Sequence, residues 1–187
     1  MLETYLEKGE ISKEQVRELI ARRKVFPCYF GSALKSQGIR EFLKGLETYT
    51  KVPDYPDTFG AKVYKISRDE KGSRLTHMKI TGGSLKVKQV LSGEDWEEKA
   101  DQIRIYSGAG FEAVKEAPAG SVCAVTGLTR THAGQGLGIE QASGEPLLIP
   151  VLNYEIQLPE ECDVHQMFLK LRQLEEEEPE LHIVWNP

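Results

Sequence analysis

The chain has 187 residues, of which 40% are hydrophobic and 28% are charged, as is typical of a folded protein of one or two domains and not of a disordered chain. No segment approaches the roughly 20 consecutive apolar residues of a membrane-spanning helix. The first ten residues include three glutamates, whereas a signal peptide begins with basic and then apolar residues. We therefore expect a cytoplasmic protein with no membrane partner.

Cysteine and histidine usage indicates neither a disulfide framework nor a metal site. Cys28, Cys123 and Cys162 are odd in number, lie far apart and form no CxxC pair. The four histidines lack the spacing of metal ligands. The expectation is three reduced thiols and no bound metal.

The net charge of -5 hides a basic segment in the middle of the chain. Residues 61–90 contain eight basic and two acidic residues, whereas residues 91–187 contain six basic and eighteen acidic ones. A basic segment is the electrostatic footprint of a phosphate-binding surface, but an ordinary solvated face has the same composition. Both interpretations stay open on charge alone. The eight basic residues are Lys62, Lys65, Arg68, Lys71, Arg74, Lys79, Lys86 and Lys88.

The first fifty residues predict two helices, a short strand and a third helix. Ser12 and Gln15 have capping-box spacing, and apolar residues follow them at helical intervals. Residues 25–30 form a compact apolar run, which predicts a buried strand. From Ile39 onward apolar residues again recur at helical spacing, until two prolines predict a domain boundary near residue 55.

From Phe59 the apolar period changes from that of a helix to that of a strand. Residues 74–80 alternate between polar and apolar, and Gly82-Gly83 then predicts the turn of a hairpin. After this turn Lys86 and Lys88 are expected to point outward and to share one face. Asp69 to Gly72 spells a DxxG motif, but with no phosphate loop upstream we expect it to be a hairpin turn.

Further strands are predicted at residues 103–105 and 122–126, after a turn at Pro118-Ala119-Gly120. Short strands at this spacing favour a closed antiparallel barrel of six strands that ends near residue 150, because closure removes unpaired edges. The remaining residues predict a strand at 151–158, a helix capped by Asp163, and a strand at 181–185, which together form a β-α-β unit. The acidic run at residues 175–178 is expected to be a solvated helix end.

This order of elements, with its wording, resembles the translational GTPases of the elongation factor G type along nearly the whole chain. The segments that resemble the end of the G domain of that family are Tyr5-Leu6-Glu7-Lys8-Gly9, Val25-Phe26-Pro27 and Gly31-Ser32-Ala33-Leu34-Lys35. Those that resemble its second-domain β-barrel are Ala61-Lys62-Val63-Tyr64-Lys65, Ile80-Thr81-Gly82-Gly83-Ser84-Leu85 and the residues from Ala119 to Leu128. Residues 150–187 resemble the first half of its ferredoxin-like third domain. The stretches Phe59-Gly60-Ala61-Lys62-Val63 and Arg74-Leu75 are similar to the ribosomal-protection tetracycline-resistance subgroup.

The resemblance implies a mainly β fold with α+β flanks. We expect the C-terminal end of a G domain at residues 1–55, an antiparallel translation-factor β-barrel at residues 56–149, and the N-terminal β-α-β part of a ferredoxin-like domain at residues 150–187. It also implies that Ser32, Ala33 and Leu34 belong to a guanine-binding loop of the parent protein. A backbone N–H at the start of a helix suits the O6 acceptor of guanine.

No GxxxxGK[ST] and no NKxD motif is present, so we expect this segment neither to bind Mg²⁺ nor to hydrolyse GTP, while the parent protein uses both GTP and Mg²⁺. The implied role of the segment is ribosome docking and relay between domains, with small-subunit RNA, and not DNA, as the nucleic-acid partner. The candidate phosphate contacts are Arg74, Lys79, Lys86, Lys88 and Arg104.

A competing hypothesis from another class is a self-contained, non-enzymatic adaptor whose barrel binds RNA or protein. Within the family, an ordinary elongation or release factor is the alternative to a tetracycline-resistance factor. The oligomeric state stays open.

Overall fold

The computed structural model describes residue 9 and residues 11–51, 53–144 and 150–185. By its internal contacts the chain divides into two units, Met1–Asp54 and Tyr55–Pro187. The three-way division into parent domains at residues 55 and 149 stays a prediction. None of the described helices is long and apolar enough to cross a membrane.

The first unit contains two packed helices, α2 (Lys13–Ala21) and α3 (Ile39–Tyr49). The predicted capping box is confirmed, because Gln15 N donates to Ser12 Oγ at 3.3 Å and Ser12 N donates to Gln15 Oε1 at 3.1 Å. Arg17 of α2 donates through Nε to the carbonyl oxygen of Thr48 at 2.8 Å and so ties the two helices together. The expected opening helix falls mostly on residues outside the described ranges.

The strand predicted at residues 25–30 is wrong. This segment pairs with no strand among the described residues, and Phe26 and Phe30 are 72% and 94% exposed. A strand is stabilised by a hydrogen-bonded neighbour, because its N–H and C=O groups need partners beside it. The apolar composition of the run therefore predicted a strand and a burial that the structure does not contain.

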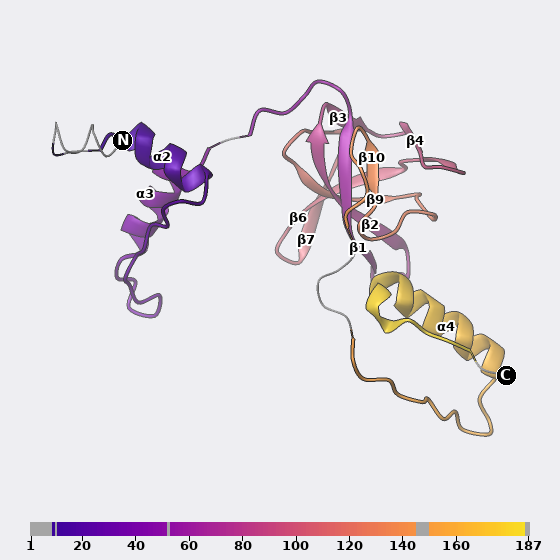
Figure 1. The fold of residues 1–187 in the computed structure, drawn as a ribbon. Coiled ribbons are helices and arrows are strands. Elements are labelled where there is room, and N and C mark those ends of the chain that lie inside the picture. Colours follow the sequence, from indigo (N-terminus) through magenta and orange to yellow (C-terminus); the bar gives the residue numbers. More distant parts are fainter. Residues whose placement is uncertain (1–8, 10, 52, 145–149, 186–187) are drawn as a thin grey trace. The chain divides into compact units, whose positions relative to one another are not determined.

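The second unit is built around a six-stranded antiparallel sheet in the order β10-β1-β2-β9-β6-β7 (Figure 1). Its strands in chain order are β1 (Gly60–Arg68), β2 (Arg74–Gly82), β6 (Gln102–Ser107), β7 (Gly110–Val114), β9 (Val122–Thr126) and β10 (Gly136–Gly138). Two short ladders accompany it, β3 (Ser84–Lys86) with β8 (Glu116–Pro118), and β4 (Val90–Ser92) with β5 (Glu97–Lys99). The strands predicted at residues 103–105 and 122–126 are confirmed.

The apolar residues of these strands form one core. Met78, Ile80 and Ile103 are fully buried in it, together with Leu85 from β3 and Leu137 from β10. The predicted mainly β fold with antiparallel pairing is therefore confirmed. The predicted closure is not, because β7 pairs only with β6 and β10 only with β1 within the described residues.

The hairpin predicted at Gly82-Gly83 is also wrong, because β2 pairs with β1 and β9, whereas β3 pairs with β8. The glycines serve a different purpose. Gly83 has a φ of 55°, its N–H donates to the carbonyl oxygen of Pro56 at 2.8 Å, and a Cβ there would lie 2.7 Å from the carbonyl oxygen of Asp57. Gly82 and Gly83 allow the chain to pass close to Pro56 and Asp57 as it leaves the sheet.

After the sheet the chain forms helix α4 (Val164–Glu177) and a short 3₁₀ turn, Pro179–Leu181. The predicted cap is confirmed, because Gln166 N donates to Asp163 Oδ1 at 3.1 Å. The two flanking strands of the expected β-α-β unit do not form. Residues 151–158 and 182–185 pair with no strand of the described chain, and the side chains of Val151 and Val184 are 89% and 85% exposed. Without a neighbouring strand their backbone N–H and C=O groups have no ladder to join.

Candidate functional site

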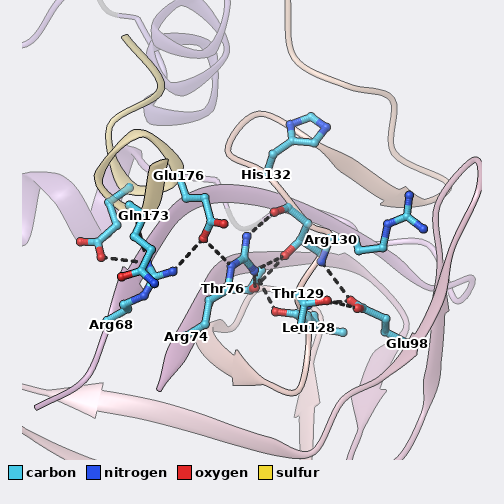
Figure 2. A network of polar contacts seen from close by, with 12 residues as sticks. Arg68, Arg74, Thr76, Glu98, Leu128, Thr129, Arg130, His132, Gln173 and Glu176 are labelled. Carbon is cyan, nitrogen blue, oxygen red and sulfur yellow. Dashed lines mark hydrogen bonds and ion pairs between the residues drawn. The ribbon is translucent and has the colours of Figure 1, made fainter. Parts of the chain in front are cut away.

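Arg74, the first residue of β2, lies at the centre of a polar network at one end of the sheet (Figure 2). Its side chain is only 14% exposed. The guanidinium Nη1 donates to the carbonyl oxygen of Leu128 at 2.8 Å and to Thr131 Oγ1 at 3.0 Å, and Nη2 donates to the carbonyl oxygen of Thr131. Thr76 and Thr131, both buried, share a hydrogen bond of 2.8 Å beneath it. Arg74 therefore holds the loop after β9 against β2.

The same guanidinium also reaches helix α4. Arg74 Nε donates to Glu176 Oε2 at 3.2 Å, and Arg68 at the end of β1 pairs with Glu176 at 2.9 Å and with Glu177 at 3.1 Å. Figure 2 shows Glu176 standing between the two arginines. Burial works to lower the pKa of Arg68, but its hydrogen bonds to Glu176 and Glu177 raise it, so the ion pairs dominate. Ion pairs thereby connect strands β1 and β2 to helix α4.

The network continues into the loop through Glu98 of β5. The carboxylate accepts hydrogen bonds from the backbone N–H of Thr129 at 2.7 Å and of Arg130 at 3.2 Å, and from the Thr129 hydroxyl. Partial burial works to raise the pKa of Glu98, but these donors hold it below its usual range. The loop is thus fixed from two sides, by Arg74 and by Glu98.

Arg104, another predicted phosphate contact, is also engaged in the fold. Its side chain is 12% exposed, and its Nη1 lies 3.0 Å from Asp69 Oδ2. Its guanidinium carbon lies 4.4 Å from the centre of the Phe111 ring, a cation–π contact. Asp69 also accepts from Lys71 N and Ser73 N, which confirms the prediction of a hairpin turn at the DxxG spelling.

Lys79, Lys86 and Lys88 are exposed, as predicted. Lys86 lies 3.8 Å from the carboxylate of Glu116, and Lys88 lies 2.6 Å from that of Asp101. The prediction that Lys86 and Lys88 share a strand face is wrong. β3 ends at Lys86, and Lys88 has a φ of 66° in the following turn, so strand alternation does not extend to it.

Much of the basic segment is therefore neutralised by the acidic part of the chain. The paired cations are Lys62 with Glu140, Arg68 with Glu176 and Glu177, Arg74 with Glu176, Lys86 with Glu116, and Lys88 with Asp101. Glu176 and Glu177 were missed by the sequence reasoning, which expected a solvated helix end. The sequence did offer one signal for this pairing. It contains a run of four glutamates at residues 175–178 and, far from it in the chain, a segment with eight basic residues at 61–90.

The predicted guanine loop is a separate turn closed by a two-residue bridge. Ser32 N and Gln37 N each donate to the carbonyl oxygen of the other residue at 3.0 Å. Helix α3 begins only at Ile39, so the expectation that Ser32, Ala33 and Leu34 lie at a helix start is wrong. The N–H groups of Ala33 and Leu34 have no acceptor within the described chain, and the Leu34 side chain is 96% exposed. Donors of this kind fit an acceptor such as guanine O6.

Histidine, cysteine and carboxylate side chains form no cluster that could hold a metal ion in the part of the chain that the structure describes. The three cysteines are free, with Cys28 exposed, Cys162 half-buried and Cys123 buried.

Similarity to known proteins extends along almost the whole chain. No family model matches the chain. The chain is 28% identical to elongation factor G 2 of Syntrophus aciditrophicus over 218 aligned positions, which cover 98% of this chain and 32% of that protein. It also resembles a solved structure, described as the crystal structure of ttk003000868 from Thermus thermophilus, with a TM-score of 0.68 and 23% identity over 96% of this chain and 29% of the other.

The likeness to elongation factor G 2 extends along almost the entire chain and supports a relationship to elongation factor G. The chain spans about a third of the length of this relative.

Proposed function

We propose that this chain is a segment of a ribosome-binding translation factor GTPase and that it serves in ribosome docking and in relay between domains. The observation that carries the relay is the sharing of Glu176 between Arg68 and Arg74. An ion-pair link between a sheet and a helix from a later part of the chain transmits displacement of one to the other, because both arginines are also held by their own strands. The likeness along 98% of the chain favours this segment over a self-contained adaptor.

For docking, the exposed lysines are the better candidates among the predicted RNA contacts. Lys79 has no carboxylate partner within the described residues, and Lys86 and Lys88 are 64% and 67% exposed in pairs that water screens. RNA phosphates can replace such partners at little cost. Arg74 and Arg104 are already bonded inside the fold, so their contribution to RNA binding is secondary.

The parent protein in this proposal binds Mg²⁺ and the phosphates of GTP through parts of its G domain other than this chain. The N–H groups of Ala33 and Leu34, next to Ser32, have no acceptor among the described residues and support a role of the turn in holding guanine. Small side chains at Ser32 and Ala33 leave room for the base to approach the backbone.

The finer proposal is a ribosomal-protection factor that releases tetracycline. It is supported by the residues of the β1 entry and of Arg74-Leu75 that resemble this subgroup. Expression of the intact gene in a sensitive bacterium tests it directly. An increased tetracycline tolerance supports the subgroup, and an unchanged tolerance assigns the chain to an ordinary elongation or release factor.

Ribosome binding of the full-length factor tests the docking role. Lys86→Glu combined with Lys88→Glu should weaken binding and flatten its salt dependence, because each lost phosphate contact reduces the log-log slope by roughly 0.7 to 0.9. Lys44→Glu combined with Lys170→Glu makes the same change in net charge at exposed positions outside the basic segment, and should leave the slope unchanged. Equal slopes for the two double variants would refute the docking role of the lysine pair.

A further inference from the structure

Four aromatic rings form a continuous row across the outer face of the six-stranded sheet. They are Tyr64 on β1, His77 on β2, Tyr106 on β6 and Phe111 on β7. The centres of neighbouring rings are separated by 6.1 Å, 6.3 Å and 5.4 Å along this order. We refer to these four residues as the aromatic row.

Strand pairing explains why rings from separate strands meet. His77 and Arg104 both pair with Ala124 of β9, which is fully buried. Because Ala124 carries only a methyl group, the rings of His77 and Tyr106 approach each other across β9. The neighbouring residue Met78 points to the opposite face and is fully buried in the core. The row is therefore on the face that the core does not use.

Three of the four rings are exposed, and His77 is half-buried. Tyr64, Tyr106 and Phe111 are 51%, 39% and 47% exposed. An exposed group of large aromatic side chains on a sheet is uncommon without a partner and indicates an interaction surface. The hydroxyl of Ser67 lies 2.7 Å from His77 Nε2 and fixes the orientation of that ring.

Positive charge lies along the same face. Lys65 pairs in register with His77, and Lys79 follows it by two residues, so strand alternation puts both lysines beside the row. Unlike Lys62, Lys86 and Lys88, neither is in an ion pair within the described residues. Arg104 stacks on Phe111 at the other end of the row. Burial, and then the charge of Lys65, lower the pKa of His77, which favours the neutral ring.

We propose that the aromatic row is a stacking platform for the bases of unpaired RNA nucleotides, with Lys65 and Lys79 meeting their phosphates. Aromatic side chains on an open sheet flanked by cations are the arrangement that binds single-stranded nucleic acid, because every base has a flat face to stack. The proposal rests on the proposed ribosome role and assigns it a binding surface distinct from Lys86 and Lys88.

Acidic residues at the end of α4 and in the turn after it restrict where RNA can lie along the row. Tyr64 and Lys65 line a groove together with Glu177, Glu178 and Glu180. These carboxylates repel phosphate, so the strand of RNA runs from Lys79 over His77 and Tyr106 to Phe111, and Tyr64 forms the border of the platform. Substitutions at Tyr106 and Phe111 should therefore matter most.

Binding of a short fluorescent oligouridylate to this chain, followed by anisotropy, tests the platform. Phe111→Ala and Tyr106→Ala should each weaken binding by about five- to 150-fold, the range that loss of one stacked base represents. Tyr106→Phe keeps the ring and should retain the affinity. Tyr154→Ala removes an aromatic ring that is 84% exposed outside the sheet and should also bind as the unchanged chain does.

A second measurement separates stacking from fold damage and from charge. In Tyr106→Trp, the indole fluorescence should be quenched when the oligonucleotide binds, whereas an acidic peptide of the same charge should leave it unchanged. Equal binding by the unchanged chain, Phe111→Ala and Tyr106→Ala would overturn the platform. So would an acidic peptide that binds more tightly than the oligonucleotide, because the surface would then serve a protein partner.

The test of the platform and the test of docking can fail separately. Loss of oligonucleotide binding in Phe111→Ala supports the platform even if the full-length factor does not bind ribosomes. Conversely, ribosome binding that depends on Lys86 and Lys88 while Phe111→Ala has no effect on oligonucleotide binding overturns the platform alone.

Discussion

Arg74 and Glu176 are 102 residues apart in the chain, yet the Nε of the arginine donates to the carboxylate of the glutamate at 3.2 Å. The guanidinium of Arg74 also donates hydrogen bonds to the carbonyl oxygen of Leu128 and to the hydroxyl of Thr131, in the loop after β9. One side chain thus fastens a loop and a helix to the same strand. Mutations should therefore separate the attachment of the loop from the attachment of helix α4.

Arg74→Ala should lower the free energy of unfolding by about 2 to 3 kcal/mol, because the carbonyl oxygens of Leu128 and Thr131 lose a charged donor in a half-buried setting. Urea denaturation followed by tryptophan fluorescence measures the change. Arg130→Ala is the matched control. Its ion pair with Asp95 is largely exposed, so the loss should stay below about 1 kcal/mol. Comparable losses for the two variants would contradict the central position of Arg74.

Glu176→Lys combined with Glu177→Lys should release α4 and leave the sheet intact. The reversed charges repel Arg68 and Arg74, whereas the hydrogen bonds of Arg74 to the loop persist. Hydrogen exchange should speed up along Val164–Glu177 and stay unchanged in β1 and β2. Glu161→Lys, at an exposed position before the helix, serves as the control. Unchanged exchange in α4 would show that the ion pairs do not hold it.

Sequence patterns predicted helices α2, α3 and α4 and strands β2, β6 and β9, because these elements depend on local periodicity and capping. Ser12 with Gln15 and Asp163 with Gln166 are cases in which the cap residues alone define a helix start. The patterns failed where a partner decides the outcome. Residues 25–30 and 151–158 are rich in apolar residues, but a strand needs a neighbour that the sequence of the segment does not specify.

The candidate functional residues also divide into those that a local pattern predicts and those that depend on distant partners. Exposure of Lys79 and Lys86 follows from strand alternation, which is local. The engagement of Arg74 with Thr131 and Glu176 depends on pairs far apart in the chain, and no spacing rule reveals them. The aromatic row is likewise invisible in the sequence, because its members come from four strands, and β9, a later strand of the chain, lies between β2 and β6 in the sheet.

Asp69 should make stability depend on pH. Hydrogen bonds from Ser73 N and from Arg104 hold the pKa of Asp69 below its usual value of 3.8, so its ionised form is favoured by folding. This contribution is present above pH 3.8 and is lost as the pH falls through the lower value of the folded protein. The difference in melting temperature between the unchanged chain and Asp69→Asn should therefore be largest near neutral pH and shrink in acid. A difference that grows in acid would contradict the ion pair with Arg104.

The three thiols should react with a disulfide reagent at different rates. Cys28 is exposed and should react first, and half-buried Cys162 should follow. Burial raises the pKa of Cys123 to about 11, so this thiol should react only after unfolding. Counting the thiols titrated in native and denatured chain measures this, with Cys28→Ser removing the fastest phase. Three rapidly reacting thiols in the native chain would show that β9 is not buried as described.

Nucleotide-dependent ribosome binding tests the central claim most directly. The full-length protein that contains this chain should sediment with ribosomes in the presence of a non-hydrolysable GTP analogue and should dissociate in GDP, because the proposed parent is a GTPase that docks on the ribosome. Sedimentation that is absent, or equal with both nucleotides, would contradict the assignment of this chain to a ribosome-bound translation factor GTPase.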